Sequence, residues 1–167
     1  MRITRLVAMI AAAALVPAAI AGAAISPSGV YKGKVHFVDS AHHRISFAWQ
    51  ATFSTGKLTR LYGIGGGLPY DPKKSTSFTC GTANLYDSAD KADHGKFAAK
   101  ITGSLAKNGS FTFKVKGKFH DVITLSGKFV SARKAKATIH LYQSHLPSKT
   151  GSNGVCDSGK LPLTLKK

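Results

Sequence analysis

The chain contains no glutamate, only two cysteines and two methionines, and a single tryptophan among its 167 residues. The lack of Glu, together with 17 glycines, disfavours a long helix or a coiled coil. Two cysteines are too few for a zinc-finger framework. Apolar residues are not scarce, because they make up 43% of the chain, with nine Phe and five Tyr. We therefore expect a packed core in one or two domains rather than a disordered chain.

Acidic residues are also few. All seven are Asp, against 24 Lys and Arg, and the formal net charge is +17. Such a surplus attracts anions and speeds the encounter with them. Most of the basic residues are Lys, which acts as a point charge and lacks the planar fork with which Arg reads bases. The composition thus favours an anionic partner and disfavours sequence-specific binding to nucleic acid.

The first segment has the layout of a secretory signal peptide. Two arginines precede an almost wholly apolar run, Leu6 to Ile20, and the small residues Ala21 to Ala23 follow. We predict cleavage near Ala23, with neighbouring small residues as alternatives, and an extracellular mature chain. A retained membrane anchor is less favoured, because the run spans about 15 residues where a membrane helix needs about 20. The predicted organisation is a signal peptide over residues 1–23 and a single domain over residues 24–167.

Export places the two cysteines, Cys80 and Cys156, in an oxidising environment, so we predict a disulfide between them. Two buried free thiols are the alternative. The bond would close a loop of about 77 residues, for which the chain-entropy relation gives about 4.5 kcal/mol of stabilisation.

Apolar and polar residues alternate along most of the mature chain, which predicts strands with one dry face and one wet face. The clearest segments are 31–37, 45–53, 97–101, 111–115, 123–129, 135–141 and 161–165, with weaker candidates at 58–64 and 76–80. No helix is evident, and a parallel sheet would need crossover helices. We therefore predict an all-β fold of about eight or nine short strands, an antiparallel β-sandwich of jelly-roll type, with a β-barrel as the alternative.

Turn signals separate these strands. Lys107-Asn108-Gly109 predicts a tight hairpin turn. Asp39 to His43 reads as a hairpin loop, and Leu68 to Lys74 and Leu146 to Gly154 read as longer loops. The recurring order Gly, Lys, apolar residue has irregular spacing, so it indicates turns leading into strands and not a solenoid repeat.

No catalytic residue, metal site or cofactor is predicted. Asp157-Ser158-Gly159 is similar to the sequence around the nucleophile of trypsin-like proteases, but the other parts of such an enzyme are missing, so we interpret it as a turn before the last strand. The histidines show no H-x-H or H-E-x-x-H spacing. A small hydrolase with Asp and His in a loop cleft remains an alternative. Its candidate residues are Asp39, His42, His43, Asp93, His94, His120 and Asp121.

Lysines on the polar phase of the strands form the candidate binding site, since several of them could line one sheet face. They are Lys32, Lys34, Lys114, Lys116, Lys118, Lys128, Lys134 and Lys136. The partner that fits them outside a cell is an anionic cell-wall polymer or an acidic polysaccharide. Lysines that serve only solubility are the alternative.

The layout resembles small secreted actinobacterial proteins of unassigned function. The residues that carry the resemblance are Gly29, Tyr31, Gly33, Ile45, Phe47, Cys80, Gly109, Phe111, Gly127, Phe129, Cys156, Ser158 and Gly159. These residues belong to strand and disulfide motifs, so the resemblance implies an exported β-sandwich and no particular activity. Our hypothesis is a secreted, non-catalytic binding module at the cell envelope. A structural or inhibitor-like module that presents the segment Leu146 to Gly154 is a further alternative.

Overall fold

The structure is a computed structural model. It describes residues 25–38, 44–65, 70–71, 73–77, 80, 85–89, 99–117 and 120–167. The predicted signal peptide, 1–23, and the loop Asp39–His43 lie outside these residues, as do Lys118, Asp93 and His94.

The described residues form ten strands and no helix. The strands are β1 (Gly29–Val38), β2 (Arg44–Ser54), β3 (Lys57–Gly65), β4 (Leu85–Asp87), β5 (Lys100–Leu105), β6 (Ser110–Lys116), β7 (Asp121–Ser131), β8 (Lys134–Ser148), β9 (Gly151–Asp157) and β10 (Leu161–Lys166). Every pairing between them is antiparallel. The predicted all-β antiparallel fold is therefore confirmed.

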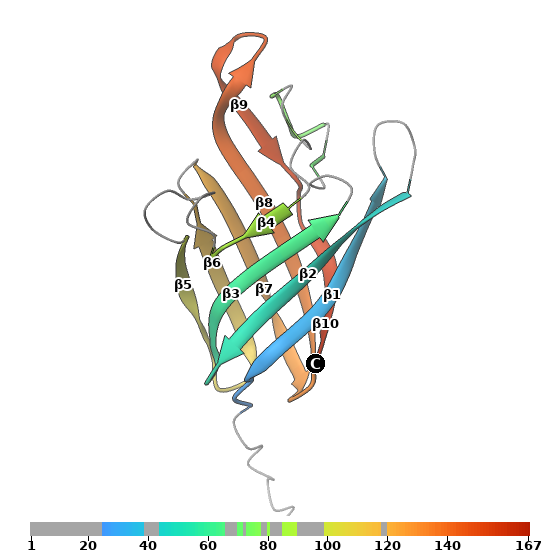
Figure 1. The fold of residues 1–167 in the computed structure, drawn as a ribbon, viewed down its shortest axis with the longest axis vertical. Coiled ribbons are helices and arrows are strands. Elements are labelled where there is room, and N and C mark those ends of the chain that lie inside the picture. The colour runs from blue at the N-terminus through green and yellow to red at the C-terminus, as the bar shows by residue number, and fades with distance from the viewer. Residues whose placement is uncertain are drawn as a thin grey trace, which may run out of the picture.

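The ten strands belong to one sheet in the order β4-β3-β2-β1-β10-β8-β7-β6-β5, with β9 paired to β8. The sheet curls, so that β1, β2 and β3 lie in front of β6, β7 and β8 in Figure 1. Its two halves enclose one apolar core, as the layers of a sandwich do. Phe53 lies at the centre of this core, where its ring meets those of Tyr31, Phe111 and Phe129 at centroid distances of 5.4 to 6.2 Å.

The chain consists of two units with the same strand pairing, β1–β5 and β6–β10. In each unit the first strand pairs with the second, the second with the third, and the third with the fourth. The fifth strand of each unit pairs with the first strand of the other, β5 with β6 and β10 with β1. The pairing of the fifth strand differs between the units, since β10 also pairs with β8 whereas the described residues form no ladder between β5 and β3.

The turn at Lys107-Asn108-Gly109 is confirmed: Gly109 N–H donates to Ala106 O, and Gly109 has a φ of 82°. The expected loop Leu146 to Gly154 is wrong, because β8 and β9 run through it as a hairpin that projects from the body (Figure 1). The hairpin turns at Lys149-Thr150, where Gly151 has a φ of 125° that suits glycine. Pro147 is accommodated because the β8–β9 register shifts between Leu146 and Ser148.

Candidate functional site

Six lysines project from the outer side of β1, β10, β8 and β7 and form what we call the lysine face. They are Lys32, Lys34, Lys166, Lys134, Lys136 and Lys128, and all are exposed. Five of them were predicted from the sequence. Lys166 was missed, although it stands on the polar phase of the alternating leucines at 161–165.

The strand register places these lysines directly opposite one another. Lys32 on β1 faces Lys166 on β10, and Lys166 faces Lys134 on β8. One row further along, Lys136 on β8 faces Lys128 on β7. Neighbouring strands lie about 4.8 Å apart, so each row holds ammonium groups on adjacent strands. Side chains alternate between the two faces of each strand, which explains why the lysines share the outer side. On β1, for example, Tyr31 is fully buried and the residues before and after it are exposed.

Like charges placed directly opposite in a sheet destabilise it. The four strands that carry the lysine face contain one acidic residue, Asp121, which is the first residue of β7. The ion pairs in the described part of the chain involve three other carboxylates, Asp71, Asp87 and Asp157. Asp157 is the last residue of β9, and Asp71 is bonded to it through the backbone, whereas Asp87 stands on β4 opposite Tyr62. None of these three carboxylates belongs to the four strands of the lysine face, which is thus a concentrated positive surface.

Two of the remaining predicted lysines form a separate group. Lys116 on β6 faces Lys100 on β5, and Lys114 faces Thr124 on β7. Thr124 and Lys128 are four residues apart on β7, which is about 13 Å along a strand. The structure therefore divides the predicted site into the lysine face and this smaller group. Lys118 lies outside the described residues.

A hollow of about 310 Å³ adjoins the lysine face on β1 and β2. Its lining includes Lys32, Lys34, Ala48 and Gln50, together with Gly33. At Gly33 the backbone of β10 comes so close that a Cβ would lie 2.5 Å from Thr164 O. Glycine therefore permits the contact between β1 and β10 that sets Lys32 beside Lys166.

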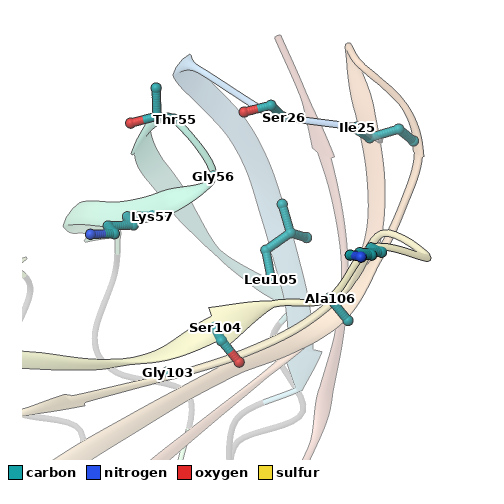
Figure 2. Close-up of a pocket in the computed structure, with 10 residues that line it drawn as sticks. Ile25, Ser26, Thr55, Gly56, Lys57, Gly103, Ser104, Leu105 and Ala106 are labelled. Atoms are coloured by element: carbon teal, nitrogen blue, oxygen red, sulfur yellow. The ribbon is translucent and has the colours of Figure 1, made fainter. Parts of the chain in front are cut away.

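A second groove, of about 370 Å³, lies at the seam between β3 and β5 (Figure 2). Leu105 projects into it from the end of β5, across from Thr55 and Gly56 in the β2–β3 turn, and Ile25 and Ser26 lie along its upper side. Among the described residues that line it, Lys57 and Lys107 are the only charged ones. The described part of its lining therefore offers no carboxylate or imidazole for acid–base chemistry.

Ser158 does not have the surroundings of a nucleophile. It is 5% exposed; its Oγ accepts the Leu141 N–H at 2.8 Å and donates to Gly159 O at 2.7 Å. Ser88 in the first unit holds the Leu61 N–H in the same way, also at 2.8 Å. Both serines follow an Asp whose carboxylate accepts a nearby N–H and meets a basic side chain. The pairs are Asp87 with Arg60, and Asp157 with His140 at 2.8 Å.

This shared motif closes the edge of each unit. In both units the Asp stands opposite a Tyr of the third strand, Tyr62 or Tyr142. The N–H of the Ser donates to the carbonyl of the Leu that precedes this Tyr. Because the same contacts occur where no histidine is present, their role is structural. The interpretation of Asp157-Ser158-Gly159 as a turn before the last strand is consistent with these contacts.

Of the histidine and aspartate candidates for a hydrolase, the structure describes His120 and Asp121. The His120 ring lies 4.3 Å, between centroids, from the ring of His145, which the sequence did not single out for this site. Both histidines have a positive φ, 56° and 61°. Within the described residues, no group of three or more His, Cys, Asp or Glu side chains is placed to hold a metal ion.

The predicted disulfide between Cys80 and Cys156 is confirmed, with a Cα–Cα distance of 5.5 Å. It ties the segment before β4 to β9, and neighbouring backbone bonds reinforce the link, such as Thr76 N–H to Val155 O at 2.8 Å. The bond therefore secures the base of the projecting hairpin. Such a bond is compatible with an extracellular protein.

Comparisons of the chain with protein-family models, curated proteins and solved structures give no match. Among the described residues, none forms a helix of the length and apolar character that crossing a membrane requires.

Proposed function

We propose that this chain is an exported, non-catalytic protein that binds an anionic polymer of the cell envelope through the lysine face. The observation that carries the proposal is the register, which sets Lys32, Lys166 and Lys134 side by side and Lys136 beside Lys128. These contacts cost stability in the free protein. A polyanion lying across the strands offsets that cost, because its charges neutralise several ammonium groups at once.

Binding to heparin, a soluble acidic polysaccharide, tests the proposal. The full-length chain is expressed, and the affinity of the exported product for heparin is measured between low and high salt. We expect affinity that falls steeply as salt rises, since exposed charges are screened within about 10 Å at 0.1 M and about 3 Å at 1 M. Retention that does not change with salt contradicts the proposal.

A matched pair of variants distinguishes binding by the lysine face from binding that depends on net charge alone. One variant replaces Lys128, Lys134, Lys136 and Lys166 with Gln; the other replaces Lys57, Lys100, Lys107 and Lys149, which lie elsewhere, with Gln. Both lower the net charge by the same amount. We expect the first to weaken binding by about tenfold or more, which is about 1.4 kcal/mol, and the second to weaken it far less. An equal loss in both overturns the assignment to this face.

Export has its own test. The mass of the protein recovered from the medium gives its N-terminus, which we expect near Ala24. Recovery of the uncleaved chain in the cell membrane contradicts secretion.

A further inference from the structure

The outer side of β1, β2 and β3 differs in chemistry from the adjoining lysine face. The register produces two rows across these strands. One contains Lys32, Gln50 and Tyr62, and the other contains Lys34, Ala48 and Ile64. Each row thus begins with a cation and ends, two strands away, with a partly exposed aromatic or aliphatic side chain.

The hollow of about 310 Å³ lies at the start of these rows. Ala48 keeps the surface low between Lys34 and Ile64, while Lys32, Lys34 and Gln50 rise around it. Its volume falls at the lower end of the range of ligand pockets, about 300–1,000 Å³. The hollow is therefore of a size for one small ring and not for a long apolar chain.

The side chains around the hollow supply three kinds of contact. The ammonium groups of Lys32 and Lys34 attract an anionic substituent, and the Gln50 amide both donates and accepts hydrogen bonds. Beyond them, Tyr62 offers an aromatic ring, whose negative face attracts weakly positive C–H groups. The Arg60 guanidinium, itself held by Asp87, lies over one face of that ring at 5.8 Å from its centroid, so the C–H contact uses the other face.

A sugar ring that carries a carboxylate or sulfate matches all three, because it has a C–H face, hydroxyl groups and a charge. A polyphosphate chain has only the charge. We infer that this hollow and Tyr62 form a subsite for an acidic sugar ring, so that the polymer is an acidic polysaccharide. The inference rests on the proposed function of the lysine face, which supplies the rest of the polymer's contacts.

Two probes test the subsite: polygalacturonate, which has a carboxylate on every sugar ring, and inorganic polyphosphate, which has no rings. The exported full-length product is titrated with each at the same ionic strength. Ala48→Leu fills the hollow, and Thr112→Leu places the same side chain on the outer side of β6 as a control. We expect Ala48→Leu to weaken polygalacturonate binding about fivefold or more while polyphosphate binding and the control are unchanged.

Tyr62 provides a second readout that does not alter the hollow. Tyr62→Phe keeps the ring and is expected to bind polygalacturonate like the parent chain, whereas Tyr62→Ala loses affinity for polygalacturonate alone. The subsite is overturned if the variants lose affinity equally for both probes, or if Ala48→Leu and Tyr62→Ala lose none. In either case, binding that weakens with salt still supports the proposal for the lysine face. If the chain binds neither polygalacturonate nor polyphosphate, both proposals are overturned.

Discussion

At the scale of single residues, buried serines hold the edges of the two units. Ser88 and Ser158 are 2% and 5% exposed, and each satisfies the N–H of a buried Leu. Replacing either with Ala leaves that N–H without its partner, so we expect each change to lower the free energy of unfolding by about 1–3 kcal/mol. Urea unfolding measures the loss, and the exposed Ser104→Ala serves as the control. Unchanged stability in Ser158→Ala contradicts the structural role.

Asp157 gives the molecule a stability that depends on pH. Burial opposes its ionisation, but the hydrogen bond from the Gly159 N–H and the contact with His140 outweigh this and hold the pKa of the Asp157 carboxyl below its ordinary value. The ionised carboxylate therefore stabilises the fold above the unfolded pKa, about 3.9, and this contribution is lost as pH falls through the lower folded pKa.

We expect Asp157→Asn to reduce stability at pH 7 and to flatten the loss of stability between about pH 5 and pH 2. Thermal unfolding across that range provides the measurement. A variant that is as steeply acid-sensitive as the parent chain shows that other carboxyl groups account for the dependence.

At the scale of strands, repulsion between the opposed lysines lowers the free energy of unfolding. Changing both Lys134 and Lys166 to Gln removes two directly opposed pairs, Lys166 with Lys134 and Lys166 with Lys32. We expect the unfolding free energy to rise by about 0.2–1 kcal/mol at low salt and the gain to disappear near 1 M salt. Unfolding in urea, which adds no ions, measures this. The control is Lys57→Gln, since Lys57 faces Ser54 and no lysine.

The β8–β9 hairpin depends on the disulfide at its base. Replacing both Cys80 and Cys156 with Ala removes a link across 76 positions of sequence, so we expect the unfolding free energy to fall by about 2–5 kcal/mol. Limited proteolysis locates the effect, and we expect new cleavage near the turn at Lys149 before the remainder of the sheet is cut. Simultaneous cleavage throughout the chain contradicts a local role.

At the scale of the whole molecule, the two units close upon each other in the same manner. β5 and β6 pair through the turn at Asn108-Gly109, and β10 and β1 pair with no turn between them. The side chain of Lys167 lies against Gly29, where a Cβ would be 3.0 Å from Lys167 Cε. A short linker can therefore replace the missing turn.

We expect a circular permutant that joins Lys167 to the segment before Gly29, and opens between Asn108 and Gly109, to fold with its disulfide intact. Its thermal midpoint should lie within about 3–8 °C of the parent chain. Calorimetry and thiol titration measure both properties. A permutant opened between Trp49 and Gln50, inside β2, is the control and is expected not to fold. Failure of both contradicts the equivalence of the two junctions.

Period-two alternation predicted most strands, but two of them escaped it. β4 is only three residues long, and Leu85-Tyr86-Asp87 is too short for a pattern. β9, with the sequence Gly-Ser-Asn-Gly-Val-Cys-Asp, has the composition of a loop and is held as a strand by pairing with β8 and by the disulfide. The duplicated motif was also missed, because its two parts, Leu-Tyr and Asp-Ser, recur 80 and 70 residues later at unequal spacing.

The sequence by itself determined the class of fold, the disulfide and the positive charge of the chain. These depend on local alternation, on two cysteines that have no other partner, and on the surplus of lysine over acid. Only the tertiary structure decided which lysines stand together, since that depends on the pairing of β1 with β10 and of β10 with β8. β1 and β10 are far apart along the chain, and β9 intervenes between β8 and β10, so no local pattern specifies either register.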